Sequence, residues 1–98
     1  MSVNKERIQL LVDALRSGEY QQGFQMLFPA PGYACAWGVA VSVSEVDLYR
    51  YRSAFAVGNW YGLDDKAVAW IMSLNDHRRF TFYEIADRLY TRYLKDPE

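Results

Sequence analysis

The most constraining feature of this chain is the stretch 74–86, where one amphipathic helix ends and another begins. Thr81 and Glu84 have the spacing of a capping box, in which each side chain accepts a hydrogen bond from the other residue's backbone amide at the start of a helix. Asn75 and Asp76 come just before this box and favour a turn. The stretch therefore predicts two helices joined by a short link, and a largely helical fold.

Two long helices each show one apolar face. The first follows Asn4, a suitable N-cap, and ends near Gly18. Its apolar residues recur at the three- and four-residue spacing of a helix: Ile8, Leu11, Val12 and Leu15. The second begins after Asp64, another N-cap, and its apolar face carries Leu63, Ala67, Trp70, Ile71 and Leu74. We also expect a short helix over 20–28, although Gly23 weakens it by about 1 kcal/mol relative to alanine.

The segment 33–57 follows no single periodicity. Val39, Val41 and Val43 alternate with small residues, as in a strand, whereas Trp37 and Ala40 fit one face of a buried helix. Of these two interpretations we favour the helix. The predicted fold is all-α: a compact bundle of four to five short helices in a single domain, residues 1–98, with a minor β element within 33–57 as the alternative.

Composition narrows the classes of protein to which the chain can belong. Eleven Lys and Arg against twelve Asp and Glu give a net charge of −1, which argues against direct nucleic-acid binding through a broad basic field. No apolar stretch approaches the roughly 18 residues of a membrane span. The single cysteine, Cys35, forms no internal disulfide and is typical of a reducing compartment. We therefore expect a cytoplasmic protein without membrane contact.

Two clusters that combine aromatic and basic residues are the best candidates for a binding site. They are Tyr49, Arg50, Tyr51 and Arg52 in one cluster and His77, Arg78 and Arg79 in the other, with Trp60 between them in sequence. Guanidinium groups bind phosphates or carboxylates in a bidentate manner, and aromatic rings stack on bases or pack against proteins. We expect these residues to contact a partner or ligand. The alternative is that both clusters are solvated turns whose aromatic residues lie in the core.

Residues suited to catalysis or metal binding form no recognisable pattern. Cys35 lies among apolar residues, which raise the pKa of a thiol and leave it unreactive. His77 is the only histidine, and the adjacent Asp76 is a poor orienting partner for a catalytic triad, because neighbouring residues on a turn generally point apart. The acidic pair Asp64 and Asp65 is explained by helix capping. We therefore expect no enzyme activity, no cofactor and no metal site.

Three pieces of the chain, in order, resemble a family of small, largely uncharacterised proteins of phages and prophages. They are the opening helix running into RSGEYQQG at 16–23, the piece YACAWGVA at 33–40, and LND at 74–76 followed by FxxIA at 82–86. The family usually carries paired cysteines followed by Leu-Gly-Val in the middle piece, whereas this chain has Cys35 alone after Ala34. The resemblance implies no catalytic residue. It implies a protein made by a phage during infection, a class whose small members commonly bind, block or sequester host components.

Three functions compete. The leading hypothesis is a non-enzymatic, phage-encoded counter-defence protein that binds and inhibits a host defence protein complex in the host cytoplasm, as anti-CRISPR proteins do. An alternative is a sponge that sequesters a nucleotide immune second messenger, with arginines on its phosphates and aromatic rings on its base. A second alternative is a small DNA-binding regulator, although Glu84 and Asp87 make the last helix a poor recognition helix. A homo-oligomer is compatible with each of these functions.

Overall fold

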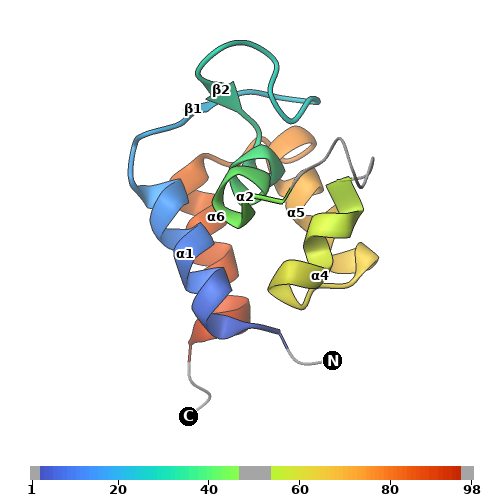
Figure 1. Cartoon of the computed structure of the whole chain (residues 1–98). Helices are drawn as coiled ribbons and strands as arrows, with labels where there is room; N and C mark the ends of the chain where they lie inside the picture. The colour runs from blue at the N-terminus through green and yellow to red at the C-terminus, as the bar shows by residue number, and fades with distance from the viewer. Residues whose placement is uncertain (1–2, 47–53, 96–98) are drawn as a thin grey trace.

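The computed structural model describes residues 3–46 and 54–95 and is mainly helical (Figure 1). In chain order the elements are α1 (Lys5–Arg16), β1 (Gln21–Gln22), β2 (Tyr33–Ala34), α2 (Ala36–Ser44), a 3-10 helix (Ala54–Val57), α4 (Gly58–Tyr61), α5 (Asp65–Asp76), α6 (Phe82–Leu89) and a π-helical segment (Tyr90–Leu94). The prediction of an all-α bundle with a minor β element is confirmed. No helix in the described parts of the chain is long and apolar enough to cross a membrane.

Helices α1 and α6 lie side by side and run in opposite directions (Figure 1). Helix α2 packs against α1 on one side, and against α5 and the 3-10 helix on the other. The two short strands and the loop between them lie at one end of the bundle, whereas the start of α1 and the π-helical segment lie at the other. The two ends therefore present different surfaces.

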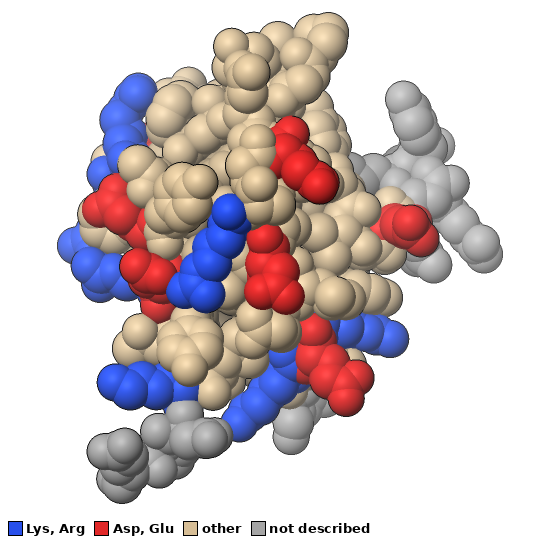
Figure 2. All heavy atoms as spheres, turned by 90° about the vertical axis from the view of Figure 1, so that its left-hand side faces the viewer, with Lys and Arg blue, Asp and Glu red and all other residues tan. Residues whose placement is uncertain are grey.

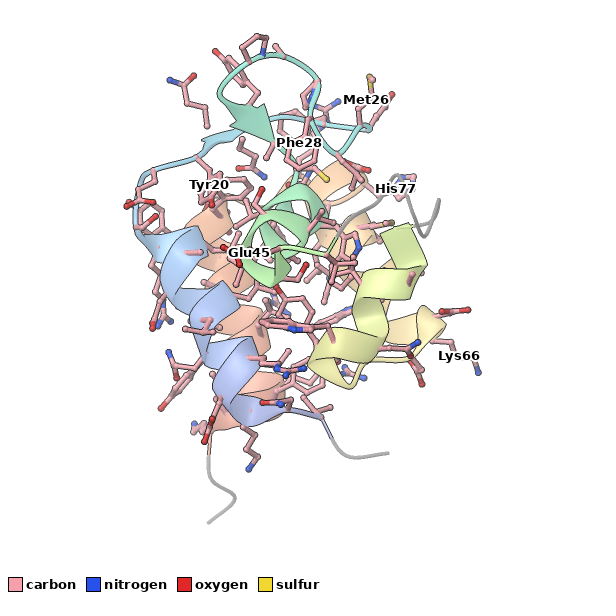
Figure 3. The ribbon with its side chains drawn as sticks, viewed as in Figure 1. Tyr20, Met26, Phe28, Glu45, Lys66 and His77 are labelled. Atoms are coloured by element: carbon pink, nitrogen blue, oxygen red, sulfur yellow. The ribbon has the colours of Figure 1, made fainter. Side chains whose placement is uncertain are left out.

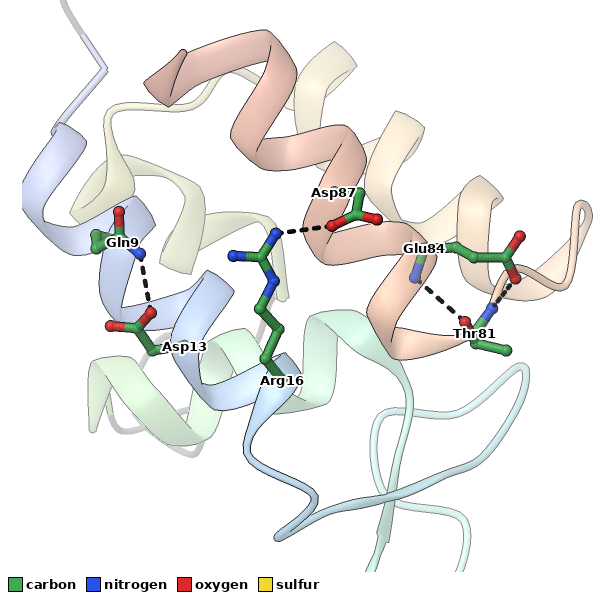
Figure 4. Close-up of polar contacts among 6 residues, drawn as sticks. All are labelled: Gln9, Asp13, Arg16, Thr81, Glu84 and Asp87. Carbon is green, nitrogen blue, oxygen red and sulfur yellow. Dashed lines mark hydrogen bonds and ion pairs between the residues drawn. The ribbon is translucent and has the colours of Figure 1, made fainter.

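The predicted N-caps start their helices as expected. The side chain of Asn4 accepts a hydrogen bond from the backbone amide of Arg7 at 3.1 Å, and that of Asp64 accepts one from Ala67 at 2.8 Å. The capping box of α6 is complete, since Thr81 Oγ1 accepts from the Glu84 amide at 3.2 Å and Glu84 Oε1 accepts from the Thr81 amide at 2.9 Å (Figure 4). Figure 4 also shows the ion pair between Arg16 and Asp87, which joins α1 to α6 at 2.7 Å.

The core explains why 33–57 showed no clear periodicity. Helix α2 fills the centre of the bundle, and residues 36–41 are all buried. A helix that is covered on every side has no polar face, so its sequence carries no amphipathic signal. Trp37 of α2 and Tyr61 of α4 are fully buried, with ring centroids 5.8 Å apart. The helical interpretation of this segment holds for Ala36–Ser44, while residues 47–53 lie outside the described part.

The short helix expected over 20–28 is wrong. Gln21–Gln22 form strand β1, which pairs in parallel with β2, and residues 23–32 form a loop. The predicted β element was therefore placed correctly at Tyr33–Ala34, but its partner strand lies outside 33–57. The physical reason is tertiary: the Gln22 side chain donates to Asn75 Oδ1 at 2.9 Å and to the Phe80 carbonyl at 2.7 Å. These bonds to residues far along the chain hold the backbone extended.

Candidate functional site

The structure places part of the predicted binding site on one exposed link. His77, Arg78 and Arg79 follow the last residue of α5 and lead toward α6, and all three side chains are exposed. The other predicted cluster lies outside the described residues: Tyr49, Arg50, Tyr51 and Arg52. The structure thus describes only the 77–79 cluster in full.

Trp60 lies elsewhere and has structural contacts. Its ring stands 4.4 Å from the guanidinium carbon of Arg7, which also donates a hydrogen bond to the Trp60 carbonyl at 2.8 Å. The ring meets Tyr61 edge-on, with centroids 4.8 Å apart. Because Arg7 belongs to the first turn of α1, this tryptophan lies toward the end of the bundle opposite the 77–79 link (Figure 1). The structure does not bring Trp60 together with that link, and its role in binding stays a prediction.

Asn75 organises the end of the bundle on which the 77–79 link lies. Its side chain is fully buried and makes a complete set of hydrogen bonds. The oxygen Oδ1 accepts from the Ala36 backbone amide at 3.0 Å and from Gln22 Nε2 at 2.9 Å. The nitrogen Nδ2 donates to the Gly23 carbonyl at 2.9 Å and to Asp76 Oδ1 at 2.8 Å. One amide therefore ties β1, the start of α2 and the end of α5 together.

The first half of the β1–β2 loop, residues 23–32, is held by further contacts. The backbone amide of Gln25 donates to Asp76 Oδ1 at 2.8 Å, and the Leu27 carbonyl accepts from the Cys35 amide at 3.0 Å. Gly38 lets α2 approach the loop, since a Cβ at this position would lie 2.2 Å from the Leu27 carbonyl oxygen. These contacts give the loop a defined shape, so that it does not have to order when it binds.

This fixed loop exposes large apolar side chains. Met26 is 62% exposed and Phe28 is 48% exposed, and Figure 3 shows both at the same end of the molecule as His77. Residues 20–44 contain no charged side chain, and in Figure 2 the tip formed by the loop is free of charge, whereas α1 and α6 carry both signs. Exposed apolar patches bordered by polar residues are typical of interaction sites.

The arginines of the 77–79 link lie beside this loop and stack on phenylalanine rings. The guanidinium carbon of Arg79 stands 4.6 Å from the ring centroid of Phe24, at the start of the loop. Those of Arg78 and Arg88 stand 5.6 and 5.0 Å from the ring of Phe80. Within residues 3–46 and 54–95 none of these arginines forms an ion pair. We call Phe24, Met26, Phe28, Arg78 and Arg79 the loop–arginine surface.

Two residues within or next to this surface have a strained backbone. Gln25 has φ +67° and Arg79 has φ +55°, the left-handed region that suits glycine. For a residue with a Cβ, this backbone conformation costs about 1 to 2 kcal/mol relative to the right-handed one. Such strain persists only where surrounding contacts hold it, and it gathers at functional sites. At Gln25 this contact is the hydrogen bond from its backbone amide to Asp76 Oδ1. At Arg79 it is the stacking of the guanidinium group on the Phe24 ring.

A separate feature, an open groove, lies at the start of α5. Its lining includes Trp70 and Tyr93, and the guanidinium carbon of Arg92 stands 4.6 Å from the Trp70 ring centroid. The charged residues of its lining are Asp64, Asp65, Lys66 and Arg92. Since these charges cancel, the groove has no strong preference for an anion or a cation.

Cys35 is the N-cap of α2 and is buried. Its Sγ accepts a hydrogen bond from the Gly38 amide at 3.4 Å. Burial raises the pKa of this thiol, which keeps it protonated and a weak nucleophile. Among the described residues there is no group of three or more His, Cys, Asp or Glu side chains that could hold a metal ion.

Sequence reasoning found the 77–79 link but missed Asn75 and the apolar loop. The loop had a visible signal, because Met26 and Phe28 directly precede the turn-forming PAPG at 29–32. Assigning both residues to a helix hid their exposure. Asn75 had no such signal, because three of its four partners, on Gln22, Gly23 and Ala36, lie about 40 to 50 residues away in the chain.

The chain matches no protein-family model, and comparisons with curated proteins and with solved structures likewise find no match. The loop–arginine surface is therefore interpreted from its own geometry.

Proposed function

We propose that this protein acts by binding a protein partner, as a phage-encoded, non-enzymatic inhibitor of a host defence protein complex. The observation that carries the proposal is the loop 23–32, which is hydrogen-bonded to the ends of α2 and α5 and exposes Met26 and Phe28. Burying apolar side chains of this size drives most protein association. A free surface of this kind is unfavourable in water, and a partner that covers it would gain that free energy.

The position of the loop also favours an inhibitor that occludes a surface. The loop projects from one end of a small bundle, and its first residue, Gly23, accepts a hydrogen bond from the buried Asn75 amide. A preorganised loop loses little conformational entropy on binding, so a small protein can still bind tightly. The resemblance to small phage proteins supplies the biological setting, in which such a protein would meet a host defence complex in the cytoplasm.

The direct test is affinity purification of the tagged protein from infected host cells that carry a defence system. We expect a host protein to elute in stoichiometric amount, and we expect the protein to restore plaque formation in the defended cells. A tag-only strain infected in parallel controls for nonspecific capture. The proposal would be abandoned if no stoichiometric partner eluted and the protein gave the phage no protection.

Sequestration of a nucleotide signal has weaker support. The groove at α5 offers Trp70 and Tyr93 for stacking and Lys66 for a phosphate. However, Arg92 already covers the Trp70 ring, and two carboxylates line the same groove. A thermal-shift series with cyclic dinucleotides and adenine-ribose compounds tests this alternative, since ligand binding to the folded state raises Tm. Only a shift that is lost in W70A would favour it over the protein partner.

A further inference from the structure

We infer that the partner offers an apolar site flanked by carboxylates, into which Met26 and Phe28 insert while Arg78 and Arg79 pair with the acidic groups. This inference rests on the proposed function, because it names the chemistry of the partner and the surface that meets it. Its basis is the adjacency of an uncharged apolar loop and guanidinium groups that form no ion pair with any residue of 3–46 or 54–95.

The charges around the surface favour an acidic partner. The carboxylates of the same region are already occupied: Asp76 accepts hydrogen bonds from Gln25 and Asn75, and Glu84 caps the start of α6. The guanidinium groups of Arg78 and Arg79 stack on rings, which leaves their N–H groups available in the described structure. Planar guanidinium groups match carboxylates in a bidentate manner. A local positive site thus borders the apolar loop of a chain whose net charge is −1.

The arrangement fits a protein better than a nucleic acid. Base stacking needs open ring faces, yet guanidinium groups lie over the rings of Phe24 and Phe80, which leaves Phe28 as the exposed phenylalanine of the loop–arginine surface. The most exposed large apolar side chain of the loop is Met26, a flexible thioether that adapts to apolar pockets on proteins. The other protein that could cover the loop–arginine surface is a second copy of this chain. The experiments below distinguish such self-association from binding to a different protein.

Arg79 provides a sharp probe because its backbone conformation suits glycine. R79G relieves the strain and removes the guanidinium group, so the fold should persist while binding weakens. R79K keeps the charge near the end of α5, where a cation favours the helix dipole, but lacks the bidentate fork. A purely structural role predicts that R79K and the native protein bind equally well.

The test uses short disulfide-constrained random peptides, displayed on cells, as the probe and the purified full chain as bait. We expect the recovered peptides to combine Asp or Glu with aliphatic or aromatic residues. Binding should weaken about 30-fold in M26S/F28S and about tenfold in R79G, with R79K in between. Raising the salt from about 0.05 to 0.5 M should weaken the native protein more than R79G. L10S and K66S are matched controls, since Leu10 is exposed on α1 and Lys66 is exposed in the first turn of α5, and both variants should bind as the native protein does.

The outcomes separate this inference from the proposed function. Recovery of no peptides, of peptides without acidic residues, or of peptides indifferent to M26S/F28S and R79G overturns the inference. Self-association of the native chain that M26S/F28S abolishes, or a salt-sensitive DNA shift that R79G abolishes, also overturns it. If a host partner is captured but binds these variants normally, the proposed function stands and the inference is wrong. If acidic apolar peptides bind at this surface while infected cells yield no partner, the inference stands and the proposed function fails.

Discussion

Replacing Asn75 should disorganise the end of the bundle that carries the loop–arginine surface. In N75A the Gly23 carbonyl and the Ala36 amide lose their partners, and both residues are buried. An unsatisfied buried group costs about 1 to 3 kcal/mol, so the two together should lower the free energy of unfolding by about 2 to 6 kcal/mol. The side chains of Gln22 and Asp76 also lose a hydrogen bond to Asn75, but both are only partly buried and can bond to water instead. We therefore add no cost in free energy for these two side chains.

This loss is large for a small domain, whose free energy of unfolding is typically about 5 to 15 kcal/mol. For a chain of this length it should lower Tm by about 10 °C or more. Urea denaturation followed by circular dichroism measures the free energy directly. Hydrogen exchange adds a local readout, since the Ala36 amide donates to Asn75 and should lose protection in N75A.

The variant N75D keeps the acceptor for Ala36 but turns the amide into a carboxylate beside Asp76, in a fully buried position. Burial and the neighbouring carboxylate both raise the pKa of the new group in the folded state. The new carboxylate therefore lowers the free energy of unfolding at neutral pH. This loss shrinks as the pH falls from about 7 toward 3.9, the approximate pKa of an aspartate in the unfolded chain. The gap in stability between N75D and the native protein should narrow over this range.

Q9A is the matched control, because Gln9 donates to Asp13 at 2.9 Å on the exposed side of α1 (Figure 4). It should change the free energy of unfolding by less than about 0.5 kcal/mol. If N75A behaved like Q9A, or kept the native protection at the Ala36 amide, the buried amide would not organise this end of the bundle and the reasoning would be refuted.

Other predictions follow from single contacts. G38A places a Cβ 2.2 Å from the Leu27 carbonyl, so urea denaturation should show a loss of about 1 to 3 kcal/mol; an unchanged midpoint would contradict this packing. The hydroxyl of Tyr61 donates to the Ala40 carbonyl, and burial raises the pKa of this phenol above its usual value near 10. The resulting stability is present below pH 10 and lost as pH rises beyond it, so Y61F should show a smaller alkaline loss in a pH series of melts. Cys35 should react slowly with a disulfide reagent in the native state and rapidly in urea, whereas equal rates would show that the thiol is exposed.

Helix starts and helix faces were predictable from local sequence. The caps at Asn4, Asp64 and Thr81 involve residues three positions apart, and the apolar faces of α1 and α5 repeat within each helical turn. Helix α2 was harder to assign, because burial on every side removes the polar face that marks a surface helix. The exposed 77–79 link was also visible locally, as charged residues after an amphipathic helix.

The conformation of 20–28 was decided by tertiary structure. Its local residues favoured a helix, but hydrogen bonds donated by Gln22 and Gln25 and one accepted by Gly23 join it to residues 75–80 and hold it as a strand and the start of a loop. Periodicity within a segment carries no information about such partners, which lie about 50 residues away in the chain. The sequence by itself thus determined the helices and the exposed arginines. Only the folded chain set Met26 and Phe28 beside them, because Asn75 is buried where β1, α2 and α5 meet.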